Sequence, residues 1–156
     1  MGLTIGMTAP DFTLYNSEKN KVTLSDLKDQ NVLLLFFPLA FTSVCTTELC
    51  HMRDNLGMYN SLNVKIIGIS VDSVYTLAKF KEEQHLNFDL VSDFNKEVSL
   101  AYDSLYETFG LGMKGVGKRS AFIINRLGKV EYAEVLENAS EVPDFQKIND
   151  VLNVII

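Results

Sequence analysis

The chain has 156 residues, of which 47% are hydrophobic and 22% charged, so a folded globular protein with one sizeable core is expected. Its net charge of −6 disfavours a nucleic-acid partner, because phosphate binding needs a basic face. The longest apolar run, Val32–Leu39, is far shorter than the roughly 20 residues of a membrane-spanning helix, so no membrane partner is expected.

The first part of the chain predicts a hairpin and then a buried strand. Two short stretches, Phe12–Leu14 and Val22–Leu24, flank the polar turn Asn16–Lys21 and are expected to pair as strands. Ser25–Leu27 follows as a short capped helical turn. The continuous apolar run Val32–Phe37 is typical of a strand that is buried on both faces.

A helix is expected from around Thr42–Val44 to about Leu62, because apolar residues recur there on one helical face (Leu49, Met52, Leu56 and Tyr59). The later part of the chain predicts a strand, a helix, a short strand, a short helix, a hairpin and an amphipathic helix: Val64–Val71, Val74–Glu83, Asp89–Val91, Lys96–Tyr102, Ser120–Asn125 with Lys129–Val135, and Val142–Val154. This order predicts an α/β fold with a mixed central sheet flanked by helices, and we expect residues 1–156 to form a single domain.

Only two cysteines are present, Cys45 and Cys50. The start of the chain shows no basic segment followed by an apolar stretch, so no secretory signal is predicted. We therefore expect a reducing, cytoplasmic location, where thiols serve chemistry rather than structural disulfides. No cofactor is expected.

The segment Phe37–Cys50 carries the clearest chemical signal, because it follows a buried strand and opens a helix. Ligand sites of open α/β sheets lie at the carboxyl ends of strands, where this loop is expected. A thiol at Cys45 would meet free backbone N–H groups and the positive end of the helix dipole, which stabilise the nucleophilic thiolate. Thr42, one turn earlier, could hydrogen-bond the sulfur, and Pro38 stiffens the loop. A buried cysteine is usually a core residue, and it is the position of Cys45 between a buried strand and a helix that favours a reactive role.

Four motifs occur in order along the chain: Gly6–Phe12, Pro38-x-x-x-Thr42-x-x-Cys45, Ile69–Asp72, and Arg119 directly before Ser120–Asn125. Together they resemble the peroxiredoxin (AhpC/TSA) family. In the same order, they are similar to the usual start of the family's chains, its active-site signature, the end of the strand that follows, and an arginine directly before a later strand. The resemblance covers nearly the whole chain.

This resemblance implies a thioredoxin-like fold and a thiol peroxidase that reduces hydrogen peroxide and organic hydroperoxides. Cys45 would be the peroxidatic cysteine, oxidised to sulfenic acid as the peroxide is reduced to water or alcohol. Thr42 and Arg119 would activate the thiolate and hold the peroxide. Pro38 would shield the sulfur, and Glu48 would orient an arginine. Without the resemblance, Arg119 predicts no more than a solvated surface charge.

Features of two peroxiredoxin subgroups occur together. Pro38–Thr42, Ser92–Phe94 and Asn125–Gly128 resemble the alkyl hydroperoxide reductase E type, which often works with one cysteine and an external thiol. Cys50, five residues after Cys45, resembles the resolving cysteine of the peroxiredoxin Q (bacterioferritin-comigratory) type. Two cycles therefore stay open: an intramolecular disulfide recycled by a thioredoxin-like reductant, or a one-cysteine cycle that uses another thiol.

A disulfide between Cys45 and Cys50 requires the helix to change. Residues five apart in an ideal helix have Cα atoms roughly 8.7 Å apart. A disulfide needs a Cα separation below about 7 Å. Oxidation is therefore expected to unwind Thr42–Cys50 and to expose the bond to the reductant, unless Cys50 is a packed core residue.

Two glycine motifs favour nucleotide binding only weakly. Gly110–Gly115 fits Gly-x-Gly-x-x-Gly, and Gly112–Lys118 matches most of a phosphate loop. Both motifs need a helix to follow, whereas Ser120–Asn125 predicts a strand. A flexible loop that positions Arg119 is the favoured interpretation.

Two further classes of function are minor alternatives. A zinc site could draw on Cys45, Cys50 and His51, but two cysteines and two histidines cannot complete a closed Cys₄ or Cys₃His site within one chain. A thiol–disulfide oxidoreductase shares the fold but needs a Cys-x-x-Cys motif, which is absent.

The apolar stretch Val151–Ile156 is expected to dock as a helix, although it could contribute to a dimer surface. A monomer or a homodimer is therefore expected.

Overall fold

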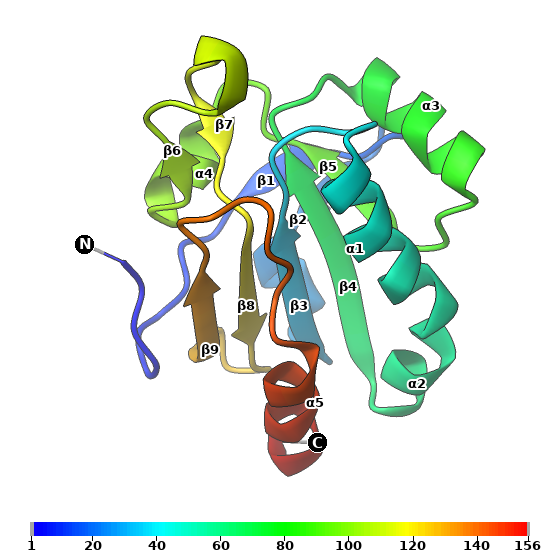
Figure 1. The fold of residues 1–156 in the computed structure, drawn as a ribbon. Coiled ribbons are helices and arrows are strands. Elements are labelled where there is room, and N and C mark those ends of the chain that lie inside the picture. Colours follow the sequence, from blue (N-terminus) through cyan, green and yellow to red (C-terminus); the bar gives the residue numbers. More distant parts are fainter. Residues whose placement is uncertain (1, 156) are drawn as a thin grey trace.

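The computed structural model describes residues 2–155. The fold is built around a central five-stranded sheet (Figure 1). The order of strands across this sheet is β5 (Asp89–Ser92), β4 (Val64–Ser70), β3 (Asn31–Phe36), β8 (Ser120–Ile124) and β9 (Val130–Val135). β3, β4 and β5 run parallel, whereas β8 and β9 are antiparallel to their neighbours. The predicted mixed sheet is confirmed.

Helices and two small sheets complete the fold. The helices are α1 (Ser43–Asp54), α2 (Leu56–Ser61), α3 (Val74–Gln84), α4 (Glu97–Ala101) and α5 (Phe145–Ile155), with 3₁₀ turns η1 (Leu24–Leu27) and η2 (Gly110–Gly112). The small sheets pair β1 (Thr13–Tyr15) with β2 (Lys21–Thr23), and β6 (Leu105–Tyr106) with β7 (Val116–Gly117). The predicted N-terminal hairpin is therefore present. None of the helices within residues 2–155 is long and apolar enough to cross a membrane.

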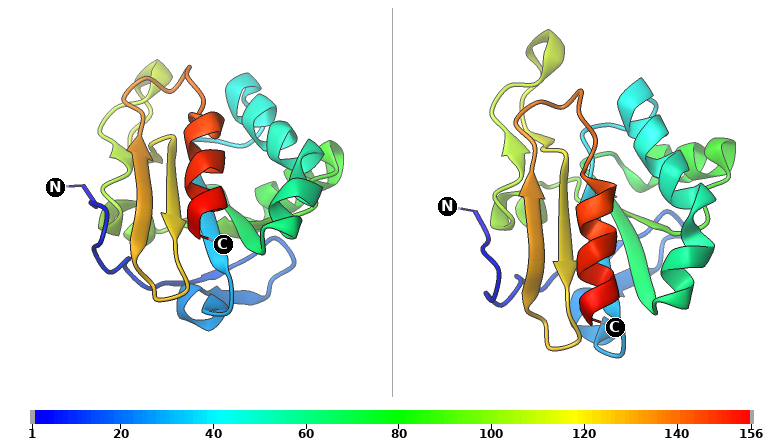
Figure 2. Two further views of the ribbon diagram at one scale, coloured as in Figure 1. Left: turned by 90° about the horizontal axis from the view of Figure 1, so that it is seen from below. Right: turned by 60° about the horizontal axis from the view of Figure 1, so that its bottom comes forward.

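The central strand β3 is buried on both faces because its alternate side chains enter two separate apolar clusters. Leu33 and Leu35 pack with α1, α3 and α5, whereas Leu34 and Phe36 pack with the hairpin side and α4. Figure 2 shows α1, α2 and α5 on one side of the sheet and the β1–β2 hairpin with η1 on the other. Burial of the whole strand places the loop that follows it at the carboxyl edge of the sheet.

The long helix predicted to reach Leu62 is in fact two helices that meet at Asn55. Asn55 has φ −112° and ψ 10°, and its side-chain amide donates to the His51 carbonyl. Asparagine competes in this way with the backbone bonds of a helix interior, which explains the break. The predicted apolar face is otherwise confirmed, since Leu49 and Tyr59 are fully buried.

Two smaller expectations also change, and one pair of strands was not predicted. α5 begins at Phe145 rather than Val142, because a residue that precedes a proline is disfavoured in helical geometry. Thr23 precedes η1 without a side-chain capping bond, so the predicted cap is wrong. Residues 103–119 contain the β6–β7 pair, which is too short to show a strand pattern in the sequence.

Two other expectations hold. The strand predicted to follow the glycine motifs, Ser120–Asn125, is present as β8. The C-terminal helix docks through Ile148 and Leu152, which are fully buried, while Ile156 lies outside the described residues.

The segment over residues 6–17 lies along both outer strands of the central sheet. At the β9 edge, the Gly6 N–H donates to the Val130 carbonyl and the Val130 N–H donates to the Met7 carbonyl, each at 2.8 Å. At the β5 edge, Asn16 forms a bridge with Val91, and the Ser17 N–H donates to the Leu90 carbonyl at 3.0 Å. The main-chain groups of both edges are thus partly paired.

Candidate active site

Cys45 lies in the first turn of α1, directly after the loop that leaves β3. Its side chain is 0% exposed, and its sulfur is a free thiol. Thr42 is the N-cap residue of α1, and its carbonyl accepts the first helical hydrogen bond, from the Thr46 N–H. The N–H groups of a first turn have no partner within the helix, and this is the end of a helix at which negative charge is favourable.

The pairing of β3 with β8 brings Arg119 to Cys45. In this antiparallel pair, Phe36 at the end of β3 lies opposite Ser120 at the start of β8. Arg119, directly before Ser120, therefore lies beside the loop that follows β3. Its Nη2 donates to the Cys45 Sγ at 3.3 Å, and its side chain is only 2% exposed.

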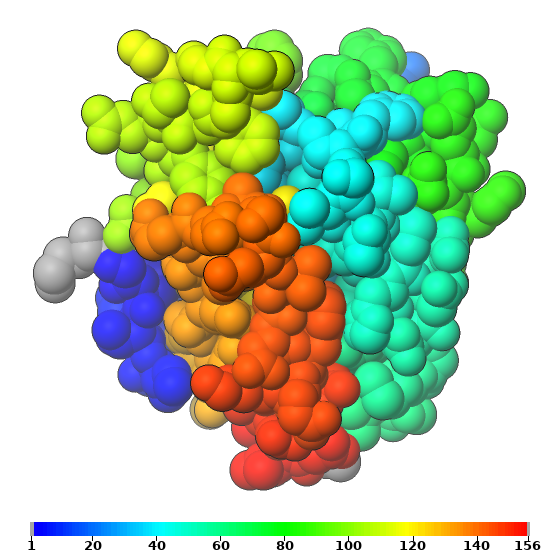
Figure 3. All heavy atoms as spheres, in the orientation of Figure 1, coloured from blue at the N-terminus to red at the C-terminus, as the bar shows by residue number. Residues whose placement is uncertain are grey.

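The same guanidinium is held by two other groups. Nη1 donates to Glu48 Oε1 at 2.7 Å, and Nε donates to the Ala139 carbonyl at 3.0 Å. Ala139 belongs to the segment between β9 and α5, which Figure 3 shows in orange beside the cyan start of α1. A planar guanidinium presents donors in a fixed fork, so these contacts fix the donor that faces the sulfur.

Glu48 lies three residues after Cys45 on the same face of α1 and is fully buried. Burial raises the pKa of its carboxyl from 4.5 to about 7, while the charge and hydrogen bond of Arg119 act in the opposite direction. Glu134 nearby raises it slightly further. Oε2 of Glu48 is buried and has no hydrogen-bond partner in the structure, in agreement with a carboxyl that is costly to ionise.

The guanidinium that faces the Cys45 sulfur stays charged in this cluster. Burial lowers the pKa of Arg119, but Cys45 and Glu48 outweigh this effect and the pKa is raised. Arg119 therefore stays a cation although it is buried. A charged donor binds a thiolate more strongly than a neutral thiol, so the arrangement supports a nucleophilic sulfur.

Thr42 and Pro38 lie in the same loop. The Thr42 hydroxyl donates to the Leu39 carbonyl at 2.7 Å, so its proton is directed there rather than to the Cys45 sulfur. Of the two bonds considered for this hydroxyl, to the sulfur or to a bound peroxide oxygen, the bond to the sulfur is not formed here, because the proton goes to a backbone carbonyl within the loop. The hydroxyl oxygen keeps lone pairs that can accept a bond from a bound molecule. Pro38, two residues after the end of β3, is buried.

Comparison with known proteins shows the family of the chain. The family model described as AhpC/TSA family matches residues 5–133. Alkyl hydroperoxide reductase E of Mycobacterium bovis is 36% identical over 153 residues, which cover 96% of each chain. A peroxiredoxin-named protein of Haemophilus influenzae, bcp, is 37% identical over 129 residues, covering 82% of this chain and 83% of the relative. The crystal structure of peroxidoxin BcpB from Mycobacterium tuberculosis superposes with a TM-score of 0.87 at 30% identity, covering 99% of both chains.

The chain belongs to the AhpC/TSA family, the peroxiredoxins. It is therefore an enzyme, a peroxidase of the peroxiredoxin type. The mixed α/β structure is the thioredoxin-like fold of that family, as predicted. Relatives of both subgroups identified from the sequence occur among the similar proteins.

The second cysteine of this peroxiredoxin lies apart from the cluster around Cys45. Cys50 is half-buried, and its Sγ donates to Gln84 Oε1 at 3.5 Å, at the end of α3. Arg53, one turn later, donates to the Gln84 carbonyl. Both cysteines are free thiols within the unbroken helix α1, so the structure shows the reduced form.

The three side chains considered as zinc ligands have different partners. Cys45 meets Arg119, Cys50 meets Gln84, and the His51 ring stacks on Phe145 at a centroid distance of 4.3 Å. The zinc interpretation therefore gains no support from the positions of these side chains.

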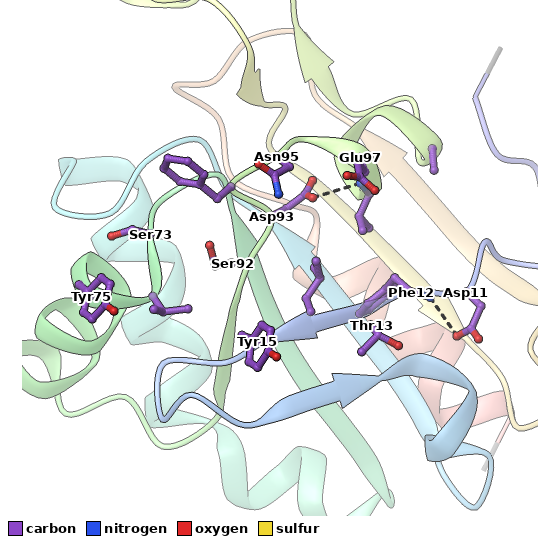
Figure 4. A pocket seen from close by; sticks show the side chains of 15 residues that line it. Asp11, Phe12, Thr13, Tyr15, Ser73, Tyr75, Ser92, Asp93, Asn95 and Glu97 are labelled. Carbon is purple, nitrogen blue, oxygen red and sulfur yellow. Dashed lines mark hydrogen bonds between the residues drawn. The ribbon is translucent and has the colours of Figure 1, made fainter.

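A cavity of about 790 Å³ lies elsewhere on the peroxiredoxin. The cavity is lined by β1, the start of α3 and the connection between β5 and α4. Its lining side chains include Tyr15, Tyr75 and Asp93 (Figure 4). Cys45 and Arg119 are not part of this lining. This cavity is therefore separate from the cluster around Cys45.

The sequence placed five residues at the site, and the structure brings three into direct contact: Cys45, Glu48 and Arg119. Thr42 and Pro38 precede them in the adjoining loop. The Ala139 carbonyl that holds Arg119 was missed, because a backbone acceptor leaves no sequence signal.

Proposed function

We propose that the chain reduces hydrogen peroxide and small organic hydroperoxides through the thiolate of Cys45. The sulfur attacks one peroxide oxygen, the O–O bond breaks, and the other oxygen leaves with a proton as water or alcohol. Cys45 becomes a sulfenic acid. The observation that carries this proposal is the buried contact at 3.3 Å between Arg119 Nη2 and the Cys45 sulfur.

Each neighbour of Cys45 has a role in this step. Arg119 stabilises the thiolate and then the negative charge that develops on the leaving oxygen. Glu48 holds the guanidinium in position through Nη1. The lone pairs of Thr42 accept a hydrogen bond from the peroxide O–H, and Pro38 limits the access of water to the sulfur.

Stoichiometric hydrogen peroxide added to reduced protein tests this function. Wild type, Cys45→Ser and Cys50→Ser are compared by rapid mixing, with free-thiol counts and intact mass as readouts. Cys50→Ser is expected to gain a single oxygen at Cys45 at the wild-type rate, and Cys45→Ser is expected to react only slowly. Equal slow reaction in all three proteins contradicts the peroxidase mechanism.

For the second step, we propose that Cys50 attacks the sulfenic acid of Cys45, forming a disulfide and releasing water. Both residues lie within α1, where their Cα atoms would be roughly 8.7 Å apart, too far for a disulfide. The first turns of α1 must therefore unwind. This change must overcome the packing of Cys45, Glu48 and Leu49, which are fully buried, whereas Cys50 itself is half-buried.

Amide hydrogen exchange over residues 42–50 measures this unwinding. Oxidised wild type is expected to exchange faster there than reduced wild type, while peroxide-treated Cys50→Ser keeps the protection of the reduced form. Equal protection in oxidised and reduced wild type would favour the one-cysteine cycle, in which an external thiol resolves Cys45.

The proposed reductant is a thioredoxin-like protein, because an exposed disulfide in a mobile segment is open to attack by another thiolate. A reducing cytoplasm would supply it. We also propose that residues 1–156 form one domain. The protein is proposed to be a monomer or a homodimer, and light scattering after gel filtration measures which of the two is present.

A further inference from the structure

Asp72 holds the loop that leads to Cys45, although it lies on a different strand connection. It follows β4, which runs parallel to β3, so both strands end at the same edge of the sheet. Asp72 Oδ2 accepts hydrogen bonds from the Ala40 N–H at 2.8 Å and from the Ser70 hydroxyl at 2.7 Å. The half-buried carboxylate thus contacts the active-site loop directly.

One peptide group links Asp72 to Thr42. The peptide between Leu39 and Ala40 gives its N–H to Asp72, and its carbonyl accepts the Thr42 hydroxyl at 2.7 Å. Because a peptide group is planar, fixing the direction of the N–H also fixes the direction of the carbonyl. A carboxylate at the N–H also polarises the peptide and makes its carbonyl a stronger acceptor.

We propose that Asp72 is a positioning residue that sets the direction of the Thr42 hydroxyl. With its proton given to the Leu39 carbonyl, the Thr42 oxygen can act towards a ligand only as an acceptor. That role fits a peroxide, whose O–H is a donor. The inference rests on the proposed peroxidase function and extends it, because it assigns selectivity for peroxide over other electrophiles to Asp72.

The rates of two reactions of Cys45 distinguish the proposed role of Asp72 from a general effect on the reactivity of the thiolate. Hydrogen peroxide requires the acceptor at Thr42, whereas alkylation by iodoacetamide requires only an accessible thiolate. Both rates are measured in a Cys50→Ser background, so that Cys45 is the only thiol. Asp72→Ala is expected to lower the peroxide rate by about ten-fold, the scale of one hydrogen bond, and to leave alkylation nearly unchanged.

Two further variants test whether Asp72 acts on the peroxide rate through the Ala40 N–H and the Thr42 hydroxyl. Asp72→Asn keeps an acceptor oxygen for the Ala40 N–H and is expected to recover most of the peroxide rate. Thr42→Val removes the hydroxyl that Asp72 is proposed to direct. Adding Asp72→Ala to Thr42→Val should then cause little further loss, because residues that act through one another are not additive.

The control is Ser92→Ala, since the Ser92 hydroxyl donates to the backbone carbonyl of Asp72 and not to its carboxylate. It should leave the ratio of the two rates unchanged. Equal loss of both rates in Asp72→Ala, or full additivity with Thr42→Val, overturns the inference while the peroxidase function stands. If the parent itself does not react with peroxide, both proposals fail. If Asp72→Ala does not fold, Ser70→Ala replaces it, and an unchanged ratio there also overturns the inference.

Discussion

Replacing the buried Glu48 by glutamine should change how stability depends on pH. Burial raises the pKa of this carboxyl from 4.5 to about 7, so the folded protein binds the proton more tightly than the unfolded chain does. The stabilisation that results is fully present below pH 4.5 and is lost as the pH rises through about 7. Glutamine has the same shape and no charge, so it does not show this loss.

The size of the effect follows from the pKa. A change from 4.5 to about 7 corresponds to roughly 3 kcal/mol, at about 1.4 kcal/mol for each pH unit. The free energy of unfolding of the parent should therefore fall by roughly 3 kcal/mol more than that of the variant between pH 4 and pH 8. Most of the difference should develop between about pH 4.5 and 7.

Urea unfolding at a series of pH values measures this difference. Both proteins carry Cys45→Ser, which removes the titration of the nearby thiol. Glu137→Gln serves as a matched control, because the Glu137 side chain is 80% exposed and should show no such window. Parallel curves for the parent and Glu48→Gln would refute the reasoning and would mean that the Arg119 ion pair keeps Glu48 charged throughout.

Arg119→Lys keeps the charge but loses the forked donors, so the rate of peroxide reaction should fall by about 10²–10³-fold in stopped-flow measurements; a wild-type rate would contradict the role of Arg119. Gly68→Ala should destabilise the fold by about 1–3 kcal/mol in urea unfolding. The added Cβ would lie 2.7 Å from Leu90 Cδ2 and 3.3 Å from Phe37 Cε1, and an unchanged midpoint would show that β4 has room for it.

Much of the fold could be predicted because burial leaves a strong pattern. The apolar run that became β3 indicates two-sided burial without any knowledge of its neighbours. The break at Asn55 was missed because the apolar face continues across it, with Met52 before it and Tyr59 after it. The two-residue strands β6 and β7 are too short for a period to show.

The site was predictable to a different degree for each residue. The position of Cys45 follows from local pattern, a buried strand and then a helix start. Arg119 lies 74 residues away, and only the resemblance placed it there, since no local pattern shows that β8 pairs with β3. The bond from Thr42 to Leu39 depends on the turn of the loop, which composition does not encode.

The contacts of residues 6–17 with both outer strands affect folding and self-association. Exposed strand edges recruit strands from other molecules, and here backbone groups of the same chain partly occupy both edges. β9, one of those edges, is among the last elements of the chain to be synthesised. The early segment over residues 6–9 therefore has no docking strand until synthesis has passed β9. The covering segment is thus made before either of the edges that it covers, so each outer strand can be paired as soon as it forms.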